Sequence, residues 1–79
     1  MISLQQVYEI RPREDGRGFD LISNRLTLGR LRFEGPYPIE DAINYAKFCS
    51  RFYPAIIRIF DESGAVAETL EFVGDFHGW

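Results

Sequence analysis

Residues 38–60 read PIEDAINYAKFCSRFYPAIIRIF, and this stretch predicts one amphipathic helix followed directly by the most apolar strand of the chain. Pro38 suits a first helical position because the missing N–H needs no partner there, whereas Pro54 disfavours helical geometry at the residue before it. We therefore expect a helix that begins at Pro38 and ends before Pro54. Its apolar residues recur at spacings of three and four, which is typical of a helix packed on one side: Ile39, Ala42, Ile43, Ala46, Cys49 and Tyr53.

Residues 55–60 are apolar at both alternating positions apart from Arg58. Such a run favours a central strand over an edge strand. Aromatic residues at 45, 48 and 52 form a second stripe beside the first stripe of the helix. The apolar surface of the helix is thus wider than one thin sheet requires, so we expect some aromatic rings to reach the surface or to be covered by a partner.

Strands are predicted on both sides of the helix. Val7–Arg13 alternates, with Tyr8 and Ile10 on one side, as in a half-buried strand. Residues 14–18 hold two glycines and predict a hairpin loop before a return strand over Phe19–Ser23.

A third strand is expected over residues 26–33. A β-bulge at Gly29 would bring Leu26 and Leu28 to the same face as Leu31 and Phe33. Arg30 and Arg32 would then point outward.

The last strand is expected at Ala65–Phe72, after a turn at residues 61–64. Val66, Leu70 and Phe72 share one parity, which predicts that they lie on one face of this strand. Residues 73–79 are interpreted as a tail that either docks through Phe76 and Trp79 or is flexible.

These elements predict an α+β fold in one two-layer domain, residues 1–79. The order is strand, strand, strand, helix, strand, strand, with a mostly antiparallel sheet of about five strands and one helix on one face. The right-handed crossover through the helix would bring residues 55–60 alongside residues 7–13.

Composition narrows the class of protein. A chain of 79 residues is one domain, and its single cysteine excludes an internal disulfide framework. Residues 1–10 lack a signal-peptide pattern, and no apolar run approaches the roughly 20 residues of a membrane span. We therefore expect a soluble, cytoplasmic protein without a membrane partner.

The charges are unevenly distributed along the chain. The net charge of −3 argues against a dedicated nucleic-acid binder. Residues 1–33 carry six arginines and four acidic residues, whereas residues 34–79 carry three basic and eight acidic residues. Such a split reflects either two surfaces of opposite sign or a chance scatter of solvated charges.

Several short segments of the sequence resemble those of a group of short bacterial proteins of unknown function. They are YEIRPR at 8–13, GFDLIS at 18–23, AINYAK at 42–47, IIRIFD at 56–61 and GDFH at 74–77. The order of elements is also similar to that of small bacterial domains with a strand–strand–helix–strand plan. The resemblance implies no activity and no functional residue.

No motif in the sequence indicates catalysis or a cofactor. Cys49 with His77 is the one possible thiol–imidazole pair, but Cys49 is expected to be a small, unreactive core residue. Asp61, Glu62 and Ser63 lack the twelve-residue calcium-loop pattern. We predict no enzyme activity, cofactor, metal or small-molecule substrate.

Four arginines of the early strands are the only candidate binding residues. Arg11, Arg13, Arg30 and Arg32 could share the open side of the sheet and contact phosphates, with neighbouring aromatic rings stacking on bases. Alternatively, Glu9 and Asp20 neutralise them on a solvated strand face.

Self-association is the preferred interpretation. The sheet face opposite the helix should carry Val7, Ile22 and either Ile56 or Ile57, and an apolar patch on a small domain commonly marks an interface. Pairing of edge strands or of open faces across a two-fold axis would cover this patch. We therefore predict a non-enzymatic protein-interaction module that forms a homo-oligomer or binds another protein. The alternative is a nucleic-acid-binding accessory domain.

Overall fold

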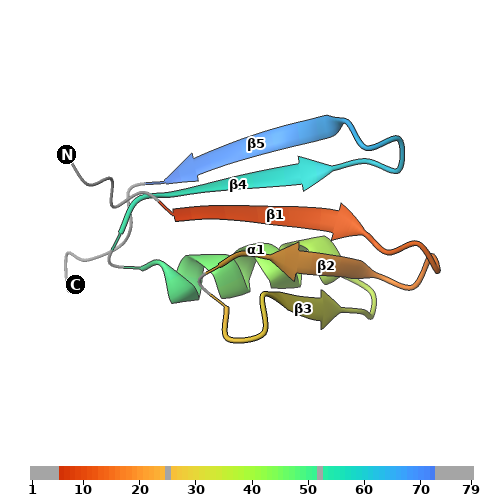
Figure 1. Cartoon of the computed structure of the whole chain (residues 1–79), viewed down its shortest axis with the longest axis horizontal. Coiled ribbons are helices and arrows are strands. Elements are labelled where there is room, and N and C mark those ends of the chain that lie inside the picture. The colour runs from red at the N-terminus through yellow and green to blue at the C-terminus, as the bar shows by residue number, and fades with distance from the viewer. Residues whose placement is uncertain (1–5, 25, 52, 73–79) are drawn as a thin grey trace.

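The computed structural model describes residues 6–24, 26–51 and 53–72, which form a five-stranded sheet and one helix (Figure 1). The elements are β1 Gln6–Pro12, β2 Phe19–Ile22, β3 Arg30–Phe33, α1 Pro38–Cys49, β4 Ala55–Phe60 and β5 Val66–Phe72. The tail predicted for residues 73–79 lies outside the described residues. Within the described segments, no helix has the length and apolar character needed to cross a membrane.

The strand order across the sheet is β3-β2-β1-β4-β5. Neighbouring strands are antiparallel except for β1 and β4, which are parallel, with Ile10 opposite Ile59. A parallel pair needs a crossover, and α1 provides it between β3 and β4 (Figure 1). The predicted α+β class, the single helix and the pairing of the first strand with residues 55–60 are confirmed.

The core lies between the sheet and α1. Tyr8, Ile10, Leu21 and Ile57 are fully buried there, and each such side chain stabilises the fold by about 1.5–3 kcal/mol. Ala42 and Ala46 are the fully buried residues of the helix, their small side chains allow a close approach to the sheet, and Ile39 and Ile43 pack beside them half-buried. The helix packs against β1, β2, β3 and β4 but not against β5.

The helix begins where the sequence predicts, with Pro38 at its start and two acidic residues in its first turn. Negative charge is favourable there because of the helix dipole. The helix ends earlier than predicted, at Cys49, since Ser50 takes the C-cap position. Ser50 is fully buried, and both its N–H and its Oγ donate to the carbonyl oxygen of Ala46, at 3.0 and 2.8 Å.

Two predicted members of the apolar stripe are not in the core. Cys49 and Tyr53 are exposed, because the buried stripe continues from Ala42 and Ala46 to Ser50 at spacings of four. Cys49 lies in the last turn of the helix, about 100° around the helix axis from Ser50. The prediction that Cys49 is a core thiol is therefore wrong.

The third strand is half as long as predicted. Residues 26–29 form a turn before β3, and the carbonyl oxygen of Gly29, a residue at φ +81°, accepts a hydrogen bond from the N–H of Ser23. Leu26 is buried but Leu28 is 83% exposed, so the two leucines do not both join the face of Leu31 and Phe33, and the predicted β-bulge at Gly29 is wrong. A strand there would have put Leu26 and Leu28 on the same face, whereas in the turn only Leu26 packs against the core.

The last strand contains an irregularity that the sequence pattern did not predict. A register shift near its start places Val66 opposite Phe60, whereas Glu68 lies opposite Ile59 and Leu70 opposite Ile57. Paired residues share a face, so Val66 lies on the other face from Leu70. The predicted common face of Val66 and Leu70 is therefore wrong.

Candidate functional site

The side of the sheet opposite α1, here called the open face, is the candidate site. Figure 1 shows α1 passing behind β2, so the view looks onto this face. Strand register and alternation place thirteen residues on it. They are Val7, Glu9, Arg11, Asp20, Ile22, Arg30, Arg32, Ile56, Arg58, Phe60, Val66, Thr69 and Glu71.

Asp20 is the anchor of the basic part of the open face. Its side chain is almost fully buried, and its two carboxylate oxygens accept hydrogen bonds from Arg13 Nη1 at 2.8 Å and Arg30 Nη1 at 3.1 Å. A buried carboxylate is tolerated when it is paired in this way. The hydrogen bond to Asp20 is the main cause that raises the pKa of Arg13 above its ordinary value.

The loop after β1 adds a second carboxylate beside Arg13. Asp15 Oδ1 lies 3.4 Å from Arg13 Nε, an ion pair without hydrogen-bond geometry. The same oxygen accepts a hydrogen bond from the backbone N–H of Arg17 at 2.9 Å. That hydrogen bond, followed by the charge of Arg13, holds the pKa of Asp15 below its ordinary value.

The other two predicted arginines are also paired. Arg11 Nε donates to Glu9 Oε1 at 3.0 Å, and its guanidinium lies 3.8 Å from the centre of the Phe60 ring, a cation–π contact. Arg32 Nη1 lies 3.1 Å from Glu34 Oε2. Each arginine of the predicted nucleic-acid site thus has an acidic neighbour.

Three of the four predicted arginines line one hollow of about 390 Å³. Arg11, Arg13 and Arg30 line it with Asp20 and Ile22, whereas Arg32 is outside it. Register places Arg11, Arg30 and Arg32 on the open face, and Arg13, just after β1, bonds Asp20 of the same face. The sequence identifies Glu9 and Asp20 as neutralising residues, but it does not show that one carboxylate serves two arginines.

An apolar strip runs beside the charged cluster. Val7 is 39% exposed and lies directly opposite Ile56 in the parallel pair, while Ile22 on β2 is half-buried. Ile57 is fully buried on the helix side. The open face therefore carries Ile56 rather than Ile57, which settles the two alternatives that the sequence leaves.

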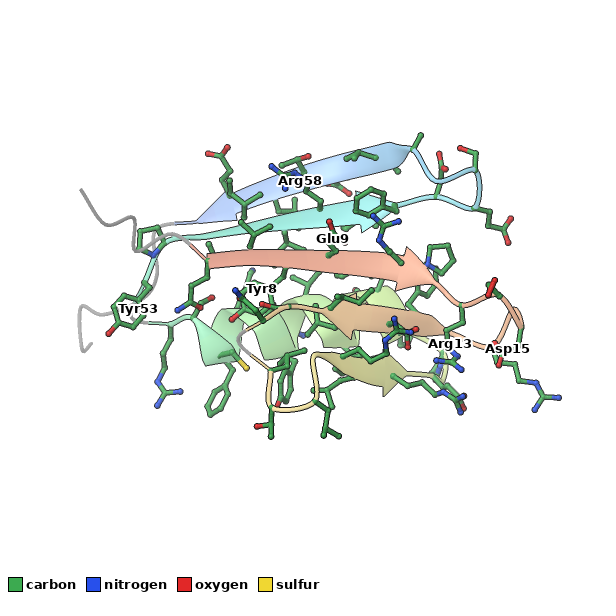
Figure 2. The ribbon with its side chains drawn as sticks, viewed as in Figure 1. Tyr8, Glu9, Arg13, Asp15, Tyr53 and Arg58 are labelled. Atoms are coloured by element: carbon green, nitrogen blue, oxygen red, sulfur yellow. The ribbon has the colours of Figure 1, made fainter. Side chains whose placement is uncertain are left out.

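Two charged residues of the open face were not singled out from the sequence. Arg58 is half-buried on β4 and Glu71 is exposed on β5, and within the described residues neither makes a hydrogen bond or an ion pair. Glu9 is the register partner of Arg58, but its Oε1 bonds Arg11. Figure 2 shows Arg58 extending toward β5 and away from Glu9. Arg58 stands out as the lone charge in an apolar strand, and this is the sequence signal that could have identified it.

A second exposed apolar group lies on the outer side of α1. Phe48 is 62% exposed and Tyr45 is also exposed, although the Tyr45 ring contacts Phe33 of β3 at a centroid distance of 5.9 Å. These rings belong to the second aromatic stripe of the helix. The expectation that part of this stripe reaches the surface is confirmed.

The loop considered for metal binding has its Asp61 carboxylate engaged in a turn. Asp61 Oδ1 accepts hydrogen bonds from Ser63 Oγ, Ser63 N and Ala65 N at 2.6, 2.9 and 3.1 Å, which is a turn-stabilising arrangement. Among the described residues, no three His, Cys, Asp or Glu side chains are grouped so that they could hold a metal ion. His77 lies outside these residues.

Comparison with protein-family models, curated proteins and solved structures finds no match to this chain. The resemblance to short bacterial proteins stays a prediction.

Proposed function

We propose that this protein is a small, non-enzymatic interaction module that self-associates through its open face. The partner is the same face of a second copy, related by a two-fold axis. The observation that carries the proposal is the strip of Val7, Ile22 and Ile56, which α1 leaves uncovered on the far side of the sheet. Burying such a strip in an interface is favourable in proportion to the apolar area removed from water.

The charges of the open face support a second copy as the partner. A two-fold interface brings the same patch of both copies together, so a patch of one sign would repel itself. Here the arginines alternate with carboxylates, as in the Arg11–Glu9 and Arg30–Asp20 pairs. A surface of mixed sign can meet its own copy without net repulsion.

The exposed thiol of Cys49 suits a reducing compartment, in line with the predicted cytoplasmic location.

Light scattering across a concentration series tests the proposal. The wild-type mass should rise from monomer to dimer, and Val7→Asp should shift the chain to monomer because it places a charge in the apolar strip. Leu28→Asp is the matched control, since Leu28 is 83% exposed in the turn before β3. A wild-type mass that stays monomeric at every concentration contradicts self-association.

A third variant separates the open face from the exposed helix surface. Phe48→Asp introduces the same charge on the outer side of α1, where Phe48 is largely exposed. It should leave the dimer intact. If Phe48→Asp alone abolishes association, the helix surface is the interface and the open face is not.

The second candidate function is a nucleic-acid-binding accessory domain. The hollow lined by Arg11, Arg13 and Arg30 favours nucleic-acid binding. Arg32 lies on β3, directly opposite Asp20 of that hollow. A guanidinium has five N–H donors, so one carboxylate partner leaves donors for phosphate. The acidic partners of all four arginines oppose this function.

Binding to mixed DNA and RNA at low and moderate salt tests the second candidate. A phosphate interface should weaken steeply as salt increases. Arg30→Glu should abolish such binding, whereas Arg17→Glu, the same charge change in the exposed β1–β2 loop, should not. Absence of binding at low salt excludes this function.

A further inference from the structure

Among the described residues of the open face, one positive and one negative residue have no ion-pair partner. Glu9 pairs with Arg11, Asp20 with Arg13 and Arg30, and Arg32 with Glu34. Arg58 and Glu71 have no such partner among the residues that the structure describes. These two charges of opposite sign lie on the neighbouring strands β4 and β5.

The apolar strip adjoins both residues. Ile56 lies directly opposite Glu71, and it is two residues from Arg58 on the same strand and face. Arg58 is half-buried, and among the described residues it has no acidic partner. A charge in that position is stabilised when a carboxylate approaches it from the open side.

We propose that Arg58 of one copy forms an ion pair with Glu71 of a second copy, beside the apolar strip. This inference rests on the proposed self-association and assigns its polar contacts. A two-fold axis makes the pair occur twice, since Glu71 of the first copy meets Arg58 of the second. The two ion pairs fix the orientation in which the apolar strips meet.

The alternative is that the two residues pair within one chain. Arg58 lies opposite Thr69, and Glu71 lies opposite Ile56, so Arg58 and Glu71 are diagonal neighbours. Diagonal neighbours on adjacent strands have Cβ atoms about 7 Å apart, within reach of long side chains. In the structure they form no ion pair and no hydrogen bond with each other, and the experiment must separate the two arrangements.

Charge reversal separates them. Arg58→Glu places two carboxylates at each contact between copies, and Glu71→Arg places two guanidiniums there. Each single variant should weaken dimerisation about tenfold or more by sedimentation equilibrium. An equimolar mixture of the two variants should dimerise within about threefold of wild type, because each contact again joins Glu and Arg. Arg58→Gln and Glu71→Gln remove the attraction without repulsion and should weaken the dimer less.

Each result decides between the arrangements. Restoration in the Arg58→Glu/Glu71→Arg double variant but not in the mixture shows pairing within a chain and overturns the inference. Single variants, neutral ones included, that dimerise like wild type also overturn it, while self-association through the strip stands. A wild-type chain that is monomeric throughout overturns the proposed function and this inference together. Circular dichroism and thermal melting confirm that each variant is folded.

Discussion

Arg13 Nη1 donates a hydrogen bond of 2.8 Å to Asp20 Oδ1, and this contact joins the chain just after β1 to the centre of β2. Asp20 is only 6% exposed, and burying a carboxylate is costly unless it is paired. The Arg13 guanidinium provides that pairing. The basic cluster of the open face is consequently part of the folded framework. It is not a set of independent surface charges.

Asp20→Asn should therefore destabilise the domain. The change leaves the Arg13 and Arg30 guanidiniums without their shared carboxylate, and loss of hydrogen bonds to charged groups costs about 2 kcal/mol of unfolding free energy. Urea denaturation measures the loss. Arg30→Gln should cost less than about 1 kcal/mol, because the Arg30 side chain is 62% exposed. Equal effects of the two changes would show that Asp20 is not the anchor.

Gly18→Ala should destabilise the β1–β2 hairpin strongly. Gly18 has φ +93°, and a Cβ there would overlap the carbonyl oxygen of Phe33. Gly16→Ala is the matched control, since Gly16 also has positive φ, at +73°, but has open space around it. We expect the control to cost about 1 kcal/mol and Gly18→Ala to cost at least twice that in chemical denaturation. A smaller loss at Gly18 than at Gly16 would contradict the close approach of residues 18 and 33.

Ala46→Leu should disturb the packing of α1 on the sheet. Ala46 is fully buried, and a larger side chain must push the helix away or adopt a strained rotamer, at about 1–3 kcal/mol. Asn44→Leu places the same side chain at an exposed position of the same helix and should change stability little. Thermal melting of both variants checks the facing of the helix. Comparable melting temperatures would mean that Ala46 does not face the core.

The turn between β4 and β5 should respond to acid through Asp61. Its hydrogen bond from Ser63 Oγ, followed by that from Ala65 N, lowers the Asp61 pKa from its ordinary value of 3.8. Because the folded pKa is the lower one, the stabilisation is present above the unfolded pKa and is lost as pH falls through the folded value. Ser63→Ala should raise the Asp61 pKa, as followed by carboxyl NMR titration. An unchanged titration would show that the Ser63 hydroxyl does not hold this carboxylate.

The sequence predicts the parts of the fold that depend on local signals. Pro38 and the acidic residues after it mark the start of α1, and the crossover rule places β4 beside β1. The helix end is harder to predict, because Ser50 looks like a surface residue. It is nevertheless fully buried, and its hydroxyl donates a hydrogen bond to the carbonyl oxygen of Ala46.

The sequence predicts most of the charged residues that belong to the candidate site, but it does not predict which of them form ion pairs with each other. Alternation puts Arg11, Arg30 and Arg32 on one face, and this much follows from the sequence once the strands are paired. Which carboxylate each arginine meets depends on strand register, since Asp20 lies opposite both Arg11 and Arg32 yet bonds Arg13 and Arg30. Likewise, Arg58 and Glu71 can be recognised as charges without an ion-pair partner only once the ion pairs of the other open-face residues are known.

Isotope-filtered NMR on a mixture of ¹³C-labelled and unlabelled chains tests the central claim most directly. Self-association through the open face predicts intermolecular nuclear Overhauser effects to the methyl groups of Val7, Ile22 and Ile56. Methyl groups on the helix side, such as Ala46, should show none. Intermolecular effects confined to α1, or their complete absence at concentrations where light scattering should report a dimer, would contradict the account.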